Sequence, residues 1–259
     1  MIRISGKDND RIKQLLRVRN DPRKSGMIFV EGVRVVKDAF ISGMVFESLF
    51  VTEERLDDIP EEILGSVEEV CIVTGDAEAK ISQTRNPQGI FALLKAPLTL
   101  SADLDIMAGA RRLLICDGIS DPGNMGSIIR SADAFGFDGV AVSPDCVSPY
   151  NDKVLRSSAG SVFHIRIFEI PSLKDSLRKL KEAGFTIYAG SLEGEPLSIG
   201  TVFDLPCCII IGNEGSGISG VCADLADRLV RIPMTGRAES LNAAVAASLM
   251  AFMCMETKT

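Results

Sequence analysis

Polar side chains that could bind a ligand or promote a reaction follow three apolar, strand-like runs of the sequence. Asn124 and Arg130 follow the first run, Glu214 follows the second, and Ser240 and Asn242 follow the third. Amide, hydroxyl and charged groups of this kind can orient a substrate and stabilise charge that develops in a reaction. In an open parallel sheet, the loops after the carboxyl ends of the strands meet at one ligand-binding crevice. The pattern therefore predicts a site at one rim of a sheet.

Strand-like and helical segments that could position these residues alternate from Arg111 onward. Short apolar runs alternate with stretches of helical pattern at 125–135, 151–159, 172–183 and 241–255. The apolar runs are RLLICD, GVAVS, VFHIRI, TIYAG, CCIIIG and LVRIP. Strands that are apolar throughout and alternate with helices are typical of a parallel sheet covered on both faces. The fold class predicted here is α/β.

The N-terminal part of the chain predicts a smaller α/β unit that precedes the parallel sheet. Residues 7–20 have the spacing of an amphipathic helix, and Asp76 is placed to cap a later helix. We expect an N-terminal domain over 1–97, a linker over 98–110 and a second domain over 111–259.

The distribution of charge favours a polyanionic partner although the net charge is −7. Residues 1–40 hold ten Lys or Arg and five Asp or Glu, so this basic arm has a net charge of +5 on an acidic protein. Such a segment can bind phosphates. The ordinary solvated face of an amphipathic helix explains the same charges, and both interpretations stay open here.

The remaining composition points to a cytoplasmic protein without a metal or a membrane partner. The seven cysteines are odd in number and contain no Cys-x-x-Cys pair, which favours free, buried thiols in a reducing compartment. His164, the single histidine, lies in the strand-like VFHIRI and is interpreted as structural. The most apolar run, Leu241–Met255, is about 22 Å long as a helix, which is too short for a bilayer core of about 30 Å.

The three polar turns also match the motifs of a known family in order and spacing. The chain resembles the SpoU (TrmH-like) family of RNA 2′-O-ribose methyltransferases, in the SPOUT class, over roughly residues 110–257. The matching residues are Asn124, Gly126 and Arg130, then Gly212-Asn213-Glu214-Gly215, then Ile232-Pro233-Met234 and Ser240-Leu241-Asn242. Residues 27–95 resemble, less specifically, the small substrate-binding domain that often precedes this one.

The resemblance implies a C-terminal deep trefoil knot, a homodimer and S-adenosylmethionine as the cofactor. The apolar helix at 241–255 suits a dimer interface. The implied cofactor-binding residues are Gly190, Ser191, Ile211, Gly212, Ile232, Met234 and Leu241. The implied catalytic residues are Arg130, Asn124, Glu214, Ser240 and Asn242. The implied substrate is structured RNA, with ribosomal RNA favoured over transfer RNA.

Arg130 is expected to act as a cation rather than as a base, because a guanidinium loses its proton only above about pH 12. It would orient a phosphate and stabilise the developing alkoxide, while Glu214 supports Arg130 or simply stabilises its own loop. The expected RNA contacts of the basic arm are Arg17, Arg19, Arg23 and Lys24. Two alternatives stay open: an RNA-binding protein of the same fold without turnover, and a knotted methyltransferase that acts on a base nitrogen.

Overall fold

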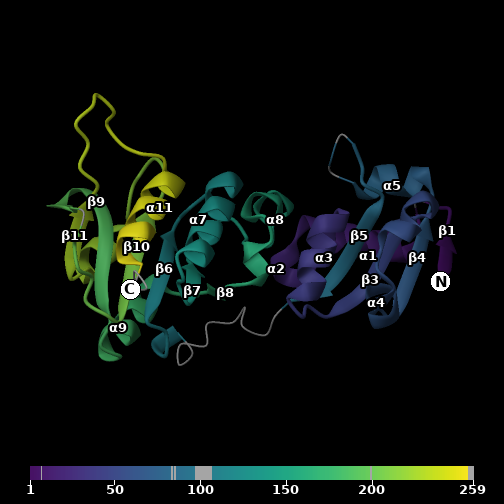
Figure 1. The fold of residues 1–259 in the computed structure, drawn as a ribbon, viewed down its shortest axis with the longest axis horizontal. Helices are drawn as coiled ribbons and strands as arrows, with labels where there is room; N and C mark the ends of the chain where they lie inside the picture. The colour runs from purple at the N-terminus through teal and green to yellow at the C-terminus, as the bar shows by residue number, and fades with distance from the viewer. Residues whose placement is uncertain (7, 83, 85, 97–106, 199, 256–259) are drawn as a thin grey trace. The chain divides into compact units, whose positions relative to one another are not determined.

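The chain divides into two compact units. The computed structural model describes residues 1–6, 8–82, 84, 86–96, 107–198 and 200–255, without the side chains of Arg23 and Lys24. Unit 1 consists of Met1–Pro97 with Tyr150–Arg156, and unit 2 of Leu98–Pro149 with Ser157–Thr259. Figure 1 shows the elements of each unit.

Unit 1 contains a mixed five-stranded sheet in the order β1-β4-β3-β5-β2. Strands β1, β4 and β3 are parallel, whereas β5 is antiparallel to both β3 and β2. Its elements are β1 (Ile2–Ile4), α1 (Asp10–Asn20), α2 (Pro22–Ser25), β2 (Met27–Glu31), α3 (Val33–Ile41), β3 (Phe46–Thr52), the 3-10 helix η1 (Glu53–Asp58), α4 (Glu61–Ser66), β4 (Glu69–Val73), α5 (Gly75–Ile81) and β5 (Ile90–Lys95).

The amphipathic first helix is confirmed as α1. Asn9 caps it by accepting a hydrogen bond from the N–H of Arg11, and Ile12, Leu15 and Val18 are buried on its inner face. The predicted cap at Asp76 is wrong. Helix α5 begins at Gly75, with Thr74 at the N-cap position, so Asp76 lies in the first turn of the helix. A carboxylate there still interacts favourably with the positive end of the helix dipole.

Unit 2 contains a six-stranded sheet in which all neighbouring strands are parallel, in the order β11-β9-β10-β6-β7-β8. This confirms the predicted parallel sheet. Its elements are β6 (Arg112–Asp117), α7 (Pro122–Ala134), β7 (Gly139–Val142), α8 (Asp152–Ser158, shared with unit 1), the 3-10 helix η3 (Ser161–Phe163), β8 (Arg166–Glu169), α9 (Leu173–Glu182), β9 (Thr186–Pro196), β10 (Cys207–Gly212), α10 (Gly220–Leu225), β11 (Arg228–Arg231) and α11 (Ala243–Cys254).

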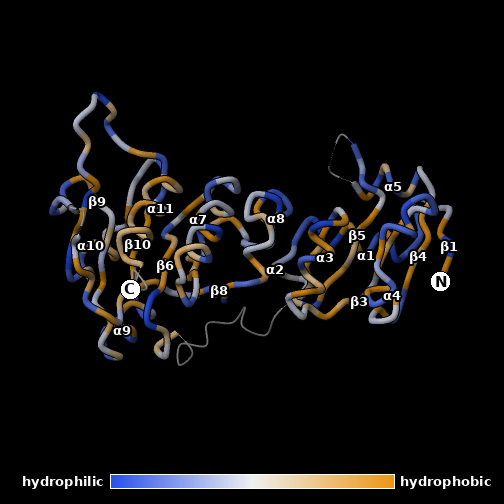
Figure 2. The backbone as a smooth tube through the Cα atoms, in the orientation of Figure 1, coloured by the Kyte–Doolittle hydropathy of each residue, from blue (hydrophilic) through white to orange (hydrophobic). Residues whose placement is uncertain are grey.

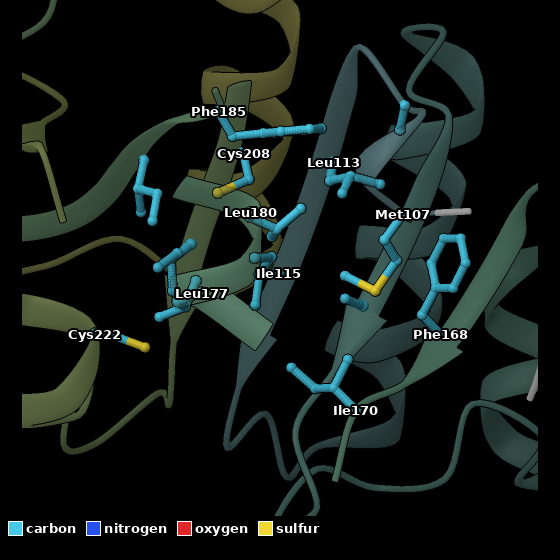
Figure 3. Packing of buried hydrophobic residues seen from close by; sticks show 14 of the residues in the cluster. Met107, Leu113, Ile115, Phe168, Ile170, Leu177, Leu180, Phe185, Cys208 and Cys222 are labelled. Atoms are coloured by element: carbon cyan, nitrogen blue, oxygen red, sulfur yellow. The ribbon is translucent and has the colours of Figure 1, made fainter. Parts of the chain in front are cut away.

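The inner strands of both sheets, such as β3, β5, β6, β7 and β10, are apolar because they are buried on both faces, and Figure 2 shows the hydrophobic colour along them. In unit 2, side chains from β6 and β10 pack against Leu177 and Leu180 of α9 and Cys222 of α10 (Figure 3). Met107 and Ala110 belong to this core, although the sequence placed them in the 98–110 linker. Residues 98–106 of that segment lie outside the described residues.

One further expectation differs from the structure, and one helix was not anticipated. His164 is not in a strand: it follows η3 and precedes β8, and its Nδ1 atom is 3.3 Å from Oδ2 of Asp133. The segment VFHIRI alternates between apolar and polar residues like a strand, but it spans the end of η3 and the start of the short strand β8. Helix α10 was not predicted, because its six residues are too few for a periodic pattern. The trefoil knot stays a prediction.

All seven cysteines are free and buried, as predicted. Among the described residues, no helix is both long and apolar enough to cross a membrane.

Candidate active site

The first polar turn connects β6 to α7. Asp121 caps α7 by accepting a hydrogen bond of 2.9 Å from the N–H of Asn124, and Pro122 occupies the first turn, where a missing N–H has no cost. A Cβ atom on Gly126 would lie 2.8 Å from the backbone nitrogen of Ser158 and closer still to Ser157. The motif glycine is therefore required by the close approach of α7 to the end of α8.

The second turn follows β10 and is closed by Asn213. The Nδ2 atom of Asn213 donates to the carbonyl oxygen of Gly118 at 2.7 Å, which ties this turn to the first one. A Cβ atom on Gly212 would lie 2.2 Å from the carbonyl carbon of Gly217 and 2.3 Å from the nitrogen of Ile218. No side chain fits at this glycine, because the turn folds back on it. Glu214 is thereby placed in a turn bound directly to the loop that follows β6.

The third turn ends where α11 begins. Asn242 is the N-cap of α11, and its Oδ1 atom accepts from the N–H groups of Ala244 at 2.9 Å and Val245 at 3.3 Å. Since the amide oxygen serves the helix, its Nδ2 group is available to donate elsewhere. The sequence identified Asn242 as a site residue, and the structure adds its role as a helix cap.

A chain of hydrogen bonds joins the three turns. Asn242 donates from Nδ2 to Oδ1 of Asn124 at 2.9 Å, and Asn124 donates from Nδ2 to Oε1 of Glu214 at 2.7 Å. The Oγ atom of Ser120 donates to Oε2 of Glu214 at 3.4 Å. A carboxylate accepts only, so Glu214 fixes the orientation of the Asn124 amide and, through it, that of Asn242. We call Glu214, Asn124 and Asn242 the amide relay.

The pKa of Glu214 is lowered from its ordinary value. Partial burial opposes ionisation, but the hydrogen bonds from Asn124 and from the backbone N–H groups of Glu214, Ser120 and Asp121 stabilise the carboxylate and outweigh it. Glu214 is therefore an anion near neutral pH. It acts as a fixed acceptor that orients the relay.

Arg130 and Ser240 are placed outside the amide relay. Arg130 lies on α7, exposed, six residues and about 9 Å of helix beyond Asn124. Within the part of the chain that the structure describes, no hydrogen bond or ion pair joins it to Glu214, so the expected support of Arg130 by that carboxylate is not observed. Ser240 is exposed in the loop before α11 and lines the cavity described next.

A cavity of about 540 Å³ lies beside the relay in unit 2. It is formed by the middle of β9, the carboxyl end of β10, the turn after β10 and the segment from β11 into α11. All seven residues expected to bind a cofactor line it: Gly190, Ser191, Ile211, Gly212, Ile232, Met234 and Leu241. Glu214 and Ser240 also face it, which places the relay at its edge.

Other cavity-lining residues were not predicted. They include Glu193 in the second half of β9, Arg231 at the end of β11, Glu239, and Met250 on α11. Glu193 comes shortly after the apolar run TIYAG in sequence, which is the kind of signal that identified Glu214, whereas Arg231 lies inside the run LVRIP. Met250 has no such signal, because it reaches the cavity two turns into an apolar helix.

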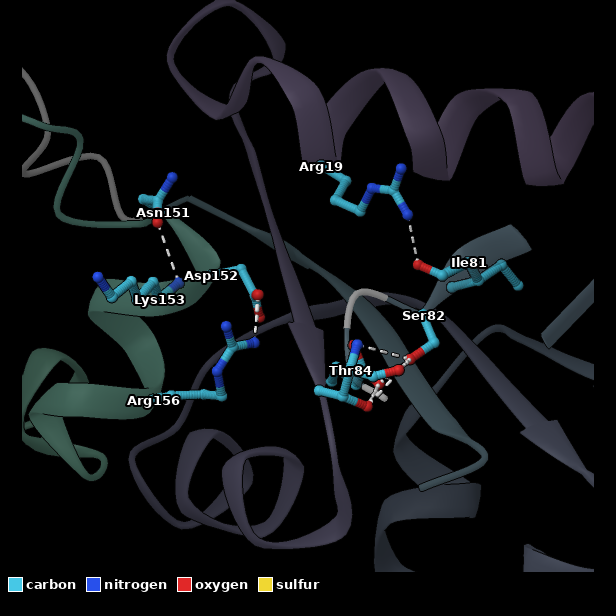
Figure 4. A network of polar contacts seen from close by, with 9 residues as sticks. Arg19, Ile81, Ser82, Thr84, Asn151, Asp152, Lys153 and Arg156 are labelled. Carbon is cyan, nitrogen blue, oxygen red and sulfur yellow. Dashed lines mark hydrogen bonds and ion pairs between the residues drawn. The ribbon is translucent and has the colours of Figure 1, made fainter. Parts of the chain in front are cut away.

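The basic arm is only partly available to a ligand. Arg17 is exposed on α1, but Nη1 of Arg19 donates to the carbonyl oxygens of Ile81 at 2.6 Å and Lys80 at 3.2 Å (Figure 4). Arg19 thus binds the last carbonyl groups of α5. The side chains of Arg23 and Lys24 lie outside the described residues.

Comparison with known proteins identifies the family. Residues 111–252 match the model of the SpoU rRNA methylase family, which is more than half of the chain. The chain belongs to this family. Residues 9–92 match an MRM3-like substrate-binding domain.

Relatives of this SpoU-family chain match it over nearly its full length. The 23S rRNA (guanosine(2553)-2′-O)-methyltransferase RlmP of Bacillus subtilis is 31% identical, over 97% of this chain and 98% of the relative. An S-adenosylmethionine-bound rRNA methyltransferase from Sinorhizobium meliloti superposes with a TM-score of 0.84 at 26% identity, over 97% and 96% of the two chains. The SpoU methyltransferase AviRb from Streptomyces viridochromogenes, in complex with the same cofactor, gives 0.81 at 30% identity, over 95% and 96%.

Proposed function

We propose that this SpoU-family chain transfers a methyl group from S-adenosylmethionine to a ribose 2′-hydroxyl of ribosomal RNA. The observation that carries the proposal is the convergence of the three family motifs. Glu214, Asn124 and Asn242, far apart in sequence, form one relay at the edge of one cavity. The relatives named for rRNA 2′-O-methylation and for the bound cofactor support the same activity.

The cavity suits the cofactor in size, shape and chemistry. Its volume of about 540 Å³ is in the range of sites for molecules of this size. Ile211, Ile232 and Leu241 offer apolar contact to a flat ring. Glu193 and Glu239 supply carboxylates that can attract the positive groups of the cofactor.

The cofactor supplies an activated methyl group, and the protein supplies positioning. The amide relay holds the turn after β10 against the start of α7, so the two sides of the site keep a fixed separation. Hydrogen bonds that are already formed before the reaction need no reorganisation as charge develops. Ser240 offers a hydroxyl at the cavity edge that can orient the ribose.

Arg130 has the role of a cation that binds RNA phosphate. It is exposed on the same helix as Asn124, and a guanidinium can bind a phosphate through two parallel hydrogen bonds. Placed against the phosphate next to the target ribose, it would stabilise the 2′-oxygen as the proton leaves to that phosphate or to water. This role needs no carboxylate partner inside the protein.

Unit 1 has the role of the substrate-binding domain. The match of residues 9–92 to a domain of that kind and the exposed Arg17 on α1 support this assignment. Arg17, Arg23 and Lys24 are the residues proposed to contact RNA. Arg19 is not among them, because its guanidinium is engaged by the carbonyl groups of α5. The seven free thiols fit a protein that acts on RNA in a reducing cytoplasm.

A homodimer through α11 completes the proposal. Val245, Leu249 and Phe252 are 46%, 40% and 53% exposed on this helix, and their spacing places them on one face. The ring of Phe252 packs edge-on against Phe135, with ring centroids 5.8 Å apart. An apolar helix face of this kind is typical of a surface covered by a partner. Sedimentation equilibrium of the chain and of Phe252→Asp tests this step.

Mass mapping of ribosomal RNA tests the function in the cell. A strain that lacks the gene should lose one ribose-methylated nucleotide, and the wild-type gene should restore it. The Arg130→Ala gene should not restore it, whereas Arg178→Ala, which changes an exposed cation on α9, should do so. Loss of a base-methylated nucleotide instead would assign the protein to base chemistry. An unchanged RNA map would favour the RNA-binding alternative.

A further inference from the structure

Two cysteine side chains meet at the amino end of β10, whereas the cavity is lined by its carboxyl end. Cys207 is the first residue of β10 and Cys254 the last residue of α11, and their sulfur atoms are 3.6 Å apart. The six residues of β10 cover about 20 Å and the twelve residues of α11 about 18 Å, and the two elements pack against each other (Figure 1). The thiol pair and the cavity therefore lie at opposite ends of β10, and on α11 Cys254 lies about one turn beyond the cavity-lining Met250.

The surroundings of the pair favour a reactive thiolate. Arg112 is the register partner of Cys207 in the neighbouring strand β6, and its positive charge acts on both thiols. The hydrogen bond from Cys207 lowers the pKa of Cys254, and Arg112 lowers it further against the effect of burial. The same hydrogen bond, followed by burial, raises the pKa of Cys207, which retains its proton. The pKa values of the other cysteines are all raised, chiefly by burial.

We propose that Cys207 and Cys254 form a peroxide-sensitive dithiol that closes to an intramolecular disulfide between β10 and α11. The sulfur atoms are already in van der Waals contact, and a bond requires them to approach from 3.6 Å to about 2.05 Å. Cys254 retains 6% exposure and Cys207 none, so Cys254 is the sulfur that meets the oxidant first.

The oxidation proceeds in two balanced steps with hydrogen peroxide as the oxidant. The Cys254 thiolate attacks one peroxide oxygen, the O–O bond breaks, and hydroxide leaves, which gives a sulfenic acid. The Cys207 sulfur then attacks the Cys254 sulfur, the S–O bond breaks, and the departing hydroxide takes the Cys207 proton as water. Both sulfurs are oxidised, and one peroxide is reduced to one hydroxide and one water. The hydroxide becomes a second water when it takes up the proton that Cys254 released on ionisation.

The disulfide would enclose most of the cofactor cavity in a covalent loop. Apart from Gly190–Glu193, every residue that lines the cavity lies between Cys207 and Cys254 in sequence. Cross-linking a loop of this length restricts the unfolded chain and raises the stability of the fold. We expect the oxidised protein to melt higher by roughly 5 °C, and the reduced protein to regain the lower Tm after dithiothreitol.

Peptide mapping of the folded, peroxide-treated protein tests the proposal. The wild type and Cys222→Ser should each lose two hydrogen atoms and yield one cross-linked peptide pair, Cys207 to Cys254. Cys222 is a matched control because it is also buried in unit 2 and burial raises its pKa to about 12. Cys254→Ser should keep all its thiols under the same treatment. In Cys207→Ser, dimedone should label Cys254, because the sulfenic acid has no resolving thiol.

Three results would overturn the proposal. The first is a wild-type protein that keeps both thiols at peroxide concentrations that oxidise free glutathione. The second is a disulfide that links any other pair, and the third is a cross-link between two chains. The wild-type peptide map decides the question even if one of the serine variants fails to fold.

Discussion

The Nδ2 atom of Asn242 donates a hydrogen bond of 2.9 Å to Oδ1 of Asn124, from a position 118 residues later in the chain. The same Asn242 caps α11 through its Oδ1 atom, and the same Asn124 donates to Glu214. A helix start, a loop and a carboxylate are thereby held in one geometry. Asn242, Asn124 and Glu214 therefore have different roles in the site geometry, and single substitutions can test these roles separately.

Asn242→Asp should separate helix capping from site geometry. Asp caps a helix as well as Asn, so the Tm should stay within a few degrees of the wild type. The substituted carboxylate cannot donate to Asn124, so kcat/KM for methyl transfer should fall about tenfold or more. Differential scanning calorimetry and initial rates measure the two effects. Unchanged rates in this variant would mean that the relay does not contribute to turnover.

Gly212→Ala should impair cofactor binding through a steric clash. The new methyl group would lie 2.2 to 2.4 Å from backbone atoms of Gly217 and Ile218, so the turn that lines the cavity must move. Overpacking of this kind costs about 1–3 kcal/mol, and isothermal titration should show weaker S-adenosylmethionine binding by about tenfold. Gly220→Ala is the control, because no atom lies within 4 Å of its added methyl group. If the two variants bind S-adenosylmethionine with equal affinity, the turn after β10 is not part of the cofactor site.

Glu214→Gln should lower stability in a pH-dependent way. The folded-state pKa of Glu214 is lowered from the ordinary value of 4.5, so its carboxylate stabilises the fold above that pH, and the contribution disappears as the pH falls through the folded-state pKa. The difference in Tm between wild type and variant should be present at pH 7 and should vanish in acid. A difference that stays constant from neutral to acidic pH would show that the charge of Glu214 has no part in it.

Arg17 and Arg19 should respond differently to neutralisation. Arg17→Gln should weaken RNA binding and reduce the slope of log K against log salt by about 0.7–0.9 for each phosphate that the variant no longer neutralises. Arg19→Gln should instead lower the Tm, because it removes the donor that serves the carbonyl groups of Lys80 and Ile81. The salt dependence of RNA binding and thermal melting measure both. A flattened salt slope with Arg19→Gln and an unchanged one with Arg17→Gln would contradict the assignment.

The elements and the general position of the site could be predicted from local pattern. Apolar strands alternating with helices define the sheet of unit 2, and the polar residues after β6 and β10 identify its ligand-binding rim. The chain's resemblance to a family added the cofactor residues, all of which line the cavity. These are properties of short sequence windows and of motif spacing, which do not depend on how distant segments pack.

The partners of individual side chains could not be predicted in the same way. Glu214 pairs with Asn124 and not with Arg130, and Arg19 binds the end of α5, because tertiary packing decides which donors reach which acceptors. His164 precedes its strand because η3 occupies residues that alternate like a strand. Met250 reaches the cavity only through the direction of α11. None of these contacts has a signal in the spacing of residues.

The most direct test of the central claim is the alkali resistance of the methylated product. The protein is incubated with methyl-labelled S-adenosylmethionine and unmodified ribosomal RNA, and the RNA is then hydrolysed with alkali. A methylated 2′-oxygen cannot attack the neighbouring phosphate, so the account predicts label in alkali-resistant dinucleotides. It also predicts that Arg130→Ala loses this label but still binds the cofactor. Label found only in mononucleotides, or full ribose methylation by Arg130→Ala, would contradict the account.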